Sequence, residues 1–270
     1  MHASTVRSLL VRGMLAGLVA GLFAFAVAYV VGEPPVNGSI AVEEAQAAAQ
    51  ETHAGHGAAA GAEAAEEEEG AVSRPVQSTF GLATGVLVYG VALGGIAALA
   101  FSFALGRVGG FGPRATAALT AAAAFTTVYL VPFLKYPATP PAVGNPDTIG
   151  RRTTLFFLMI LLSVLLGLAA VIIGRRLAPR LGNWNATLAA SGGFLVVTAV
   201  AFVLLPANDD AVQAGFPAAL LWEFRLASLA VQAVLWAVFG VVFGVLAQKA
   251  LAGRTAAADA RATAGAPLPG

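Results

Sequence analysis

Several apolar runs of about 20 residues constrain this chain more than any other feature. A helix of that length crosses the hydrocarbon core of a bilayer, which is about 30 Å thick. Hydrophobic residues make up 58% of the sequence, above the globular range of about 45–50%. The sequence therefore predicts an all-α membrane protein with a bundle of about six transmembrane helices. The runs are approximately 9–31, 80–105, 115–134, 153–174, 186–205 and 218–246.

Changes in composition divide the chain into four parts. Residues 1–32 are predicted to form the first transmembrane helix, and 79–250 a five-helix bundle that includes a structured loop at 131–152. Residues 33–78 are rich in Ala, Glu and Gly and predict a disordered acidic external loop, while 251–270 predict a disordered cytoplasmic tail. A cleaved signal peptide is the alternative for the first run, but that run is longer than a hydrophobic region of 7–15 residues, which favours a retained helix.

Basic residues fix the expected orientation. With both termini in the cytoplasm, ten Lys and Arg residues fall inside and four outside, with Arg225 at a boundary, which is a positive-inside bias. Nearly all acidic residues fall outside, where they attract cations. The inside set is Arg7, Arg12, Arg107, Arg114, Arg175, Arg176, Arg180, Lys249, Arg254 and Arg261, and the outside set is Arg74, Lys135, Arg151 and Arg152.

Small residues indicate which helices lie close to one another. Gly13, Gly17 and Gly21 form a small-xxx-small row on the first run, a spacing that lets another helix approach closely. The run 115–134 is also poor in bulky side chains, as expected for a helix buried among others. The run 153–174 is nearly pure Leu, Ile, Val and Phe, and is the best candidate for a lipid-facing helix.

The connection at 131–152, here called the central loop, is stiff, partly aromatic and charged. Its five prolines bar a regular helix. We interpret it as a structured loop at a membrane boundary, and a rigid linker without chemistry is the alternative. Its polar residues make it a candidate site: Asn145 and Asp147 as metal ligands, and Lys135, Arg151 and Arg152 in structural or gating roles.

Two further groups of charges lie beside the last runs. Asp209 and Asp210 follow the fifth run, and Glu223 and Arg225 stand near the start of the sixth. Ionisable residues near spans are costly and suggest function. Asp, Asn and loop carbonyls suit a hard or borderline divalent cation, so the three carboxylates join the candidate ligands, with Arg225 in a gating role.

A network across the loops would satisfy these charges, and we consider two pairings. Asp147 would pair with Arg225, or Glu223 with Arg151. Simple anchoring of helix ends in the membrane interface is the alternative.

His53 and His56 lie in the first external loop with the spacing H-x-x-H. On a helix, side chains three apart share a face, and imidazole with carboxylate suits Co, Ni or Zn. Capture of a metal ion is one interpretation, and a solvated acidic linker is the other.

The sequence also excludes several chemistries. It contains no cysteine, which excludes thiolate metal sites and disulfides. No nucleotide-binding loop or nucleophile motif is present, so we expect no enzyme activity, no bound cofactor and no nucleic-acid partner.

Two pairs of like residues are each separated by 74 positions in the sequence, a spacing that an internal repeat would produce. Pro132 and Pro206 each end an apolar run, and Arg151 and Arg225 each stand near the start of the next. The spacing fits a parallel repeat of the last two hairpins, as in many transporters, and four matched positions also arise by chance.

Two long motifs resemble the CbtA family of proposed cobalt transporter subunits. They are LVPFLKYPATPPAVGNPDTIGRRT and LLPANDDAVQAGFPAALLWEFRLASLAVQAVLW, and VRGMLAGLVAGLFA near the amino end is similar too. The resemblance implies a bacterial inner-membrane component of Co²⁺ uptake, with Co²⁺ as the transported ion and a small one-span CbtB-like subunit as partner. Nickel or another divalent cation, or a non-transport scaffold role, is the alternative. The first loop departs from the family pattern, with only two histidines and EEEEGAVSR before the second span.

Overall fold

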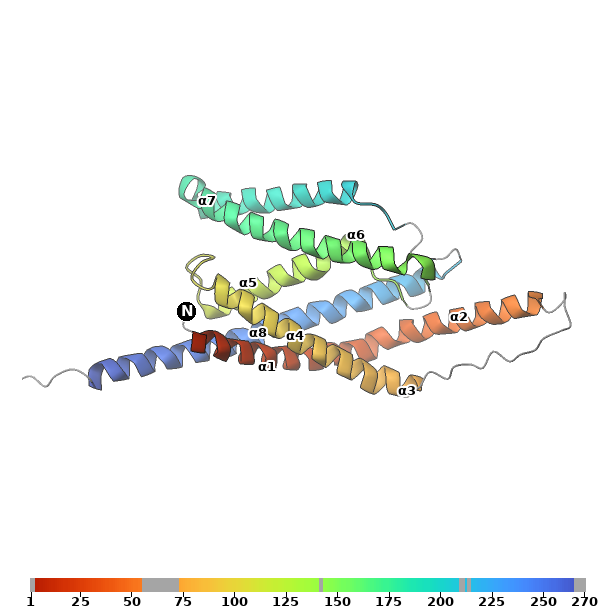
Figure 1. Cartoon of the computed structure of the whole chain (residues 1–270), viewed down its shortest axis with the longest axis horizontal. Helices are drawn as coiled ribbons and strands as arrows, with labels where there is room; N and C mark the ends of the chain where they lie inside the picture. The colour runs from red at the N-terminus through yellow and green to blue at the C-terminus, as the bar shows by residue number, and fades with distance from the viewer. Residues whose placement is uncertain (1–2, 55–72, 141–142, 209–211, 213–214, 265–270) are drawn as a thin grey trace, which may run out of the picture. The chain divides into compact units, whose positions relative to one another are not determined.

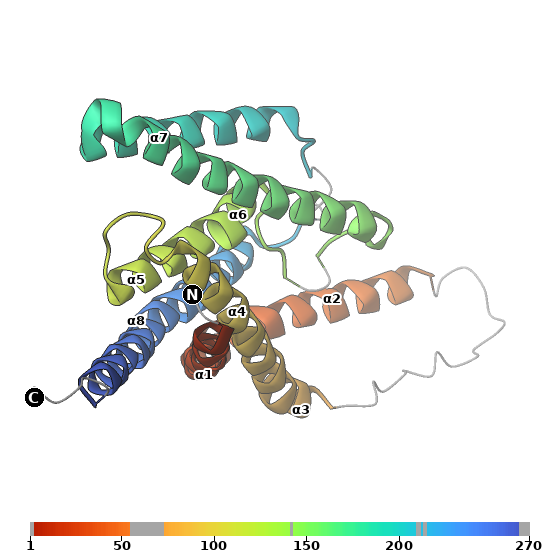
Figure 2. The same ribbon diagram turned by 60° about the vertical axis from the view of Figure 1, so that its left-hand side comes forward.

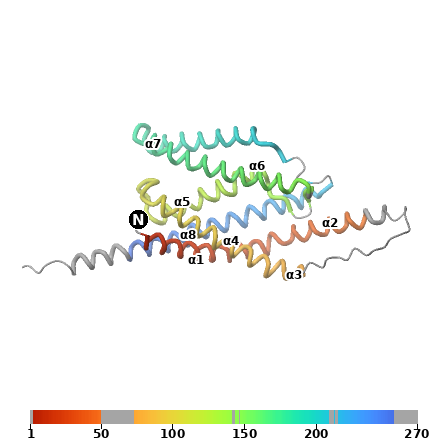
Figure 3. Tube along the Cα trace, in the orientation of Figure 1, coloured from red at the N-terminus to blue at the C-terminus, as the bar shows by residue number. Residues whose placement is uncertain are grey.

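The computed structural model describes residues 3–54, 73–140, 143–208, 212 and 215–264 (Figure 1). Figure 3 traces the path of the chain along its Cα atoms in the same orientation. These residues form helices joined by turns and loops, and none of them lies in a strand. The α-helices are α1 (Ala3–Val27), α2 (Glu33–Ala54), α3 (Arg74–Val76), α4 (Leu82–Ala104), α5 (Pro113–Ala124), α6 (Val131–Lys135), α7 (Ile149–Leu204) and α8 (Ala218–Ala264). Three π-helical turns, η1 (Ala28–Gly32), η2 (Gln77–Gly81) and η3 (Phe125–Leu130), and one 3₁₀ turn, η4 (Pro146–Thr148), complete the set.

Within the described residues, five continuous helical stretches are long and apolar enough to cross a membrane: Ala3–Ala49, Arg74–Ala104, Pro113–Lys135, Ile149–Leu204 and Ala218–Gly253. The predicted all-α membrane bundle is therefore confirmed, while the count of about six spans stays a prediction. In the apolar 18-residue segment of each stretch, 11% of the residues are buried in α7, against 22–39% in the other stretches. That exposure agrees with the lipid-facing helix expected at 153–174.

Helix α7 turns back on itself, as Figures 1 and 2 show. The reversal is at Gly182, where φ is 75° and ψ is 161°, a conformation that glycine adopts without a steric penalty. The fourth and fifth predicted runs occupy the two limbs of this hairpin. The limbs approach closely near Gly174, where an added Cβ would lie 3.2 Å from the Cβ of Ala190.

Two segments differ from the prediction of disorder. Within 33–78, residues Glu33–Ala54 form α2, and within 251–270, α8 continues to Ala264. Glu33–Ala54 is rich in Ala and Glu, and the extension of α8 is rich in Ala; both residue types have high intrinsic helix propensity, which outweighs the low apolar content of these segments. Residues 55–72 and 265–270 lie outside the described residues.

Two of the π turns end two positions before a proline. A proline lacks the N–H that would bond the carbonyl four residues earlier, and its ring clashes with that carbonyl. For Pro34 and Pro132 this carbonyl belongs to Val30 in η1 and Val128 in η3. The wider π turn accommodates the ring and lets the helix continue. Pro132 therefore lies inside the helical stretch, which continues through α6 to Lys135, one residue beyond the predicted end of the run at 134.

The chain forms two compact units, and each is described separately. The first unit comprises Met1–Phe23, Val86–Thr126 and Ala233–Gly270. In it α1 and α4 pack backbone against backbone: a Cβ added at Gly13 would lie 2.5 Å from the carbonyl oxygen of Gly94, and one added at Gly90 would lie 2.6 Å from that of Gly17. The glycine row thus makes the close helix contact that its spacing predicted.

Aromatic rings fill the rest of this first unit. Phe101 on α4 meets Phe243 on α8 edge to face, with ring centroids 5.0 Å apart, and Phe239 stacks on Phe243 at 5.2 Å. Such pairs add about 0.5–1.5 kcal/mol beyond their buried area. Gly240 brings α8 against α5, where an added Cβ would lie 3.0 Å from the Cβ of Ala121.

Substitution of Gly17 by Val will destabilise the first unit, because the new side chain would meet the carbonyl oxygen of Gly90. Overpacking of this kind costs about 1–3 kcal/mol in free energy of unfolding. The measurement is thermal unfolding of the purified protein in detergent. Gly85→Val is the matched control, because Gly85 lies on α4 with nothing within 4 Å of an added Cβ. Equal effects of the two substitutions would contradict the close contact.

Candidate functional site

The second unit, Ala24–Gly85 and Thr127–Gln232, contains the whole central loop. The loop rests on a hydrophobic cluster whose buried members are Val131, Tyr136, Leu155 and Met159, with Phe156, Phe194, Phe202 and Leu205 packed against them. These residues come from α6, the loop and both limbs of α7. The cluster therefore fixes the start of the loop against the α7 hairpin.

The side chain of Lys135 caps the carboxyl-terminal end of α7. Its Nζ donates to the carbonyl oxygen of Phe202 at 2.7 Å. In an α-helix that carbonyl would accept from the residue four positions later, which here is Pro206 and has no N–H. Lys135 thus supplies a donor that the backbone cannot, and its predicted structural or gating role in transport stays a prediction.

Tyr136 makes a second hydrogen bond at the carboxyl-terminal end of α7. Its ring is buried, and its hydroxyl donates to the carbonyl oxygen of Pro206 at 2.9 Å. Burial raises the pKa of the Tyr136 hydroxyl above its usual value, and the positive charge of Arg151 opposes that rise. Tyr136 was not among the candidate site residues predicted from the sequence, where the central loop stood out only as partly aromatic.

Arg225 holds the middle of the loop from α8. Its Nε donates to the carbonyl oxygen of Ala138 at 3.3 Å, and its guanidinium carbon lies 5.6 Å from the ring centroid of Trp222. A residue of α8 therefore pins the central loop 87 positions earlier in the sequence.

Asn145 organises the carboxyl-terminal half of the loop. Its Oδ1 accepts from the backbone N–H of Asp147 at 3.0 Å, and its carbonyl oxygen accepts from Arg152 at 3.1 Å. The Arg152 guanidinium lies in the space that a side chain at Gly144 would need. Both oxygens of Asn145, a predicted ligand, are thus engaged in the fold of the loop itself.

The remaining charges around the loop are exposed. Asp147, Arg151 and Glu223 lie at the surface of the second unit. Neither of the two expected pairings, Asp147 with Arg225 or Glu223 with Arg151, forms an ion pair among the described residues. The expectation of a cross-loop charge network was wrong because Arg225 bonds a backbone carbonyl instead.

The described residues contain no group of three or more His, Asp or Glu side chains that could hold a metal ion. His53 lies in the last turn of α2, and His56, Asp209 and Asp210 lie outside the described residues. The role of all these residues as metal ligands stays a prediction.

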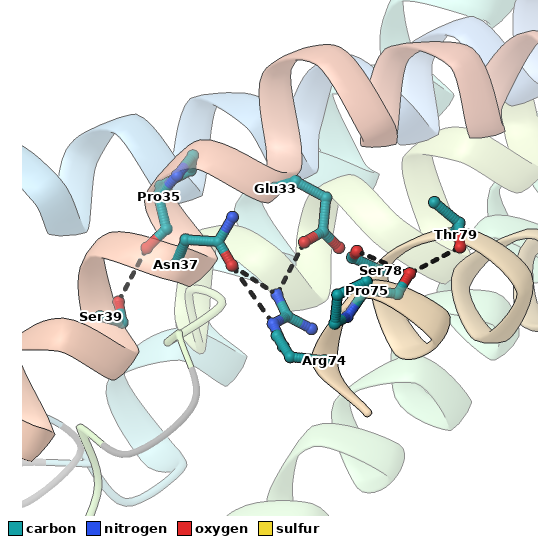
Figure 4. Close-up of polar contacts among 8 residues, drawn as sticks. All are labelled: Glu33, Pro35, Asn37, Ser39, Arg74, Pro75, Ser78 and Thr79. Atoms are coloured by element: carbon teal, nitrogen blue, oxygen red, sulfur yellow. Dashed lines mark hydrogen bonds and ion pairs between the residues drawn. The ribbon is translucent and has the colours of Figure 1, made fainter. Parts of the chain in front are cut away.

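The structure adds a polar cluster that the sequence analysis did not identify. The Nη2 atom of Arg74 lies 2.7 Å from Glu33 Oε2 and donates to Asn37 Oδ1 at 2.9 Å (Figure 4). The Nε atom of Arg74 donates to the same Asn37 oxygen at 3.2 Å. The available signal was a carboxylate just after the first span and an arginine just before the second, which have opposite charge and close the same loop.

A second unanticipated contact lies within the membrane-spanning part. Ser163 on the first limb of α7 donates to the carbonyl oxygen of Thr127 in η3. Thr127 lies in the π turn that precedes Pro132, so this bond joins the irregular part of the third span to α7.

The proposed repeat is not supported by the places of its marker residues. Pro132 lies inside the helical stretch that ends at Lys135, whereas Pro206 follows the end of α7. Arg151 is exposed, whereas Arg225 bonds Ala138. The repeat itself stays a prediction.

Taken together, the long apolar helices and the loop seated on them define a multi-pass α-helical membrane protein. Residues 6–248 match the family model described as "Probable cobalt transporter subunit (CbtA)". The chain belongs to this family. No curated protein and no solved structure shows a significant match. Cobalt is the transported ion in that description, the word subunit implies partners, and transporter subunits are usually not enzymes.

Substitution of Lys135 by Met will lower the free energy of unfolding, because it keeps the apolar stem and leaves the Phe202 carbonyl without its donor. A bond from a charged donor contributes about 1.5–3 kcal/mol. Thermal unfolding in detergent measures the loss. Lys249→Met is the control, since Lys249 is exposed on α8. A loss no larger than that of the control would contradict the role of Lys135.

Tyr136 will make stability depend on alkaline pH. Because its pKa is raised in the folded state, its stabilising contribution is complete below the unfolded pKa of about 10 and is lost as pH rises through the folded value. Tyr136→Phe should therefore be less stable than wild type near neutral pH by about 1 kcal/mol, and the gap should narrow at high pH. Unfolding curves collected between pH 8 and roughly 11 test this. A constant gap would argue against a raised pKa.

Proposed function

We propose that this chain is the permease subunit of a Co²⁺ uptake system. The observation that carries the proposal is the family match over nearly the whole chain, combined with a helical bundle long enough to cross a membrane. In this proposal external carboxylates concentrate the cation, His53 and His56 bind it transiently, and the central loop forms the mouth of the transport path.

The distribution of charge around the central loop supports a cation at this place. Lys135, Arg152 and Arg225 each donate to a backbone carbonyl, so each side chain has a role in the fold around the loop. The carboxylates of Asp147 and Glu223 are exposed and form no ion pair among the described residues. Carboxylate oxygens of this kind are free to exchange water for a divalent cation.

The proposal includes a place and a partner. The chain would lie in a bacterial inner membrane with both termini in the cytoplasm, following the positive-inside bias of its Lys and Arg residues. A small one-span CbtB-like subunit would complete the system. Asp209 and Asp210 would add carboxylates beside the loop. Arg151 would gate access through its exposed charge.

A scaffold subunit without transport activity is the second candidate. It is favoured by one observation, which is that most polar groups of the central loop bond to the loop itself or to helix ends. A stiff loop of this kind also suits the docking of a partner protein. Uptake of nickel or another divalent cation is an alternative within the permease role, because the usual order of metal affinities gives cobalt no advantage.

Replacement of Asp147 by Asn will lower Co²⁺ uptake by about tenfold or more, the scale at which loss of a metal-supporting group acts. Uptake of radioactive cobalt is measured in a transport-deficient bacterium that expresses this chain with and without a CbtB-like partner. Asp259→Asn is the control, because it removes a carboxylate from the tail that is predicted to be cytoplasmic and leaves the central loop intact.

The outcomes separate the two roles. Saturable uptake by wild type that falls in Asp147→Asn but not in the control supports the permease. Unchanged uptake together with lost binding of the partner supports the scaffold. Competition by nickel at equal concentration would show that the path does not select cobalt.

A further inference from the structure

The ion pair between Arg74 and Glu33 joins positions 41 residues apart. It ties the first turn of α2 to the residue that opens α3, so it closes the base of the connection between them. The Glu33 side chain is 13% exposed and that of Arg74 is 37% exposed. A carboxylate so nearly buried needs its partner, because an unpaired charge in such a place is costly.

The cluster has the geometry of a specific clamp rather than a chance surface contact. The guanidinium reaches Glu33 and Asn37 together, which lie four positions apart and hence on one face of α2. Figure 4 shows the side chains of Glu33 and Asn37 converging on Arg74. A planar fork of donors can satisfy two acceptors in this way, whereas a lysine ammonium cannot reproduce the arrangement.

Helix α2 is in turn seated on α8. An added Cβ at Gly38 would lie 2.9 Å from Leu220, so the two helices touch next to the clamp. Five residues further along α8, Arg225 bonds Ala138 in the central loop. A continuous set of contacts within the second unit therefore leads from Arg74 through α2 and α8 to the central loop.

We propose that Arg74 is a positioning residue for metal uptake, one that fixes α2 so that its ligands are presented to the central loop. Helix α2 carries the exposed carboxylates of Glu43 and Glu44, and His53 lies in its last turn. Without the clamp α2 loses its tie to α3, and the carboxylates of Glu43 and Glu44 spread over a larger volume. This inference rests on the proposed Co²⁺ uptake.

The first test separates affinity from turnover. Arg74→Ala should raise the Co²⁺ concentration for half-maximal uptake by about fivefold, the lower end of typical coupling between sites, and leave the maximal rate unchanged. Arg74→Lys should recover part of the loss, and the charge swap Glu33→Arg with Arg74→Glu should recover more than either single variant. Arg107→Ala is the control, because that arginine bonds the carbonyl of Phe103 only four positions away.

The second test reads the position of α2 without transport. The chain has no cysteine, so spin labels can be placed at Ala47→Cys on α2 and Ile149→Cys at the start of α7, both exposed sites. The distance distribution between the labels should be narrow in the wild-type background and should broaden with Arg74→Ala. A distribution unchanged by Arg74→Ala, or a variant that loses maximal rate with unchanged half-saturation, would overturn the proposal.

The two tests also keep this inference apart from the proposed function. If the wild-type chain takes up no cobalt but Arg74→Ala broadens the distribution, the clamp stands and the uptake function fails. If uptake is saturable and both readouts ignore Arg74, the permease stands and the positioning role fails.

Discussion

Every backbone carbonyl that leaves the regular helix pattern near lipid needs a donor from the protein, because the hydrocarbon core offers no water. This requirement accounts for several of the long-range polar contacts in the second unit. Pro206 has no N–H to offer the carbonyl of Phe202, and the side chain of Lys135 bonds it instead. Ser163 bonds the carbonyl of Thr127 in the π turn before Pro132, and Arg225 reaches a loop carbonyl rather than a carboxylate. These side chains therefore lie where the backbone departs from the regular helix pattern.

The helical bundle was largely predictable from the sequence because its signals are local. The length of the apolar runs located the membrane-spanning stretches. The spacing of Gly13 and Gly17 predicted the close approach of another helix, because small residues four apart permit it, and the structure shows that this helix is α4. The differences also have local causes. The π turn that accommodates Pro132 within the helix leaves no clear mark in composition. Helix α2 combines low hydrophobicity, which predicts disorder, with the high helix propensity of Ala and Glu.

The candidate site was predictable in its location and not in its pairings. The sequence placed the important polar residues in the central loop and beside the last helix, and the structure shows these segments bonded to each other. The acceptor that an arginine bonds depends on which groups the fold brings within its reach. Opposite charges predicted an ion pair for Arg225, but a carbonyl 87 residues away satisfied it. The Arg74 clamp shows the converse case, in which a true ion pair joined residues that looked like separate helix-end charges.

The π turns have a consequence for how surface patterns along these helices are read. Each widened turn holds more residues than an α-helical turn, so it rotates everything that follows it about the helix axis. In the stretch from α5 to α6, the stripe of residues that faces the bundle before η3 is not continued at the same spacing after it. A labelling scan of solvent or lipid accessibility across this stretch would show a phase shift rather than one steady period. A single inserted residue in a membrane helix thus redirects a whole face while the helix itself continues.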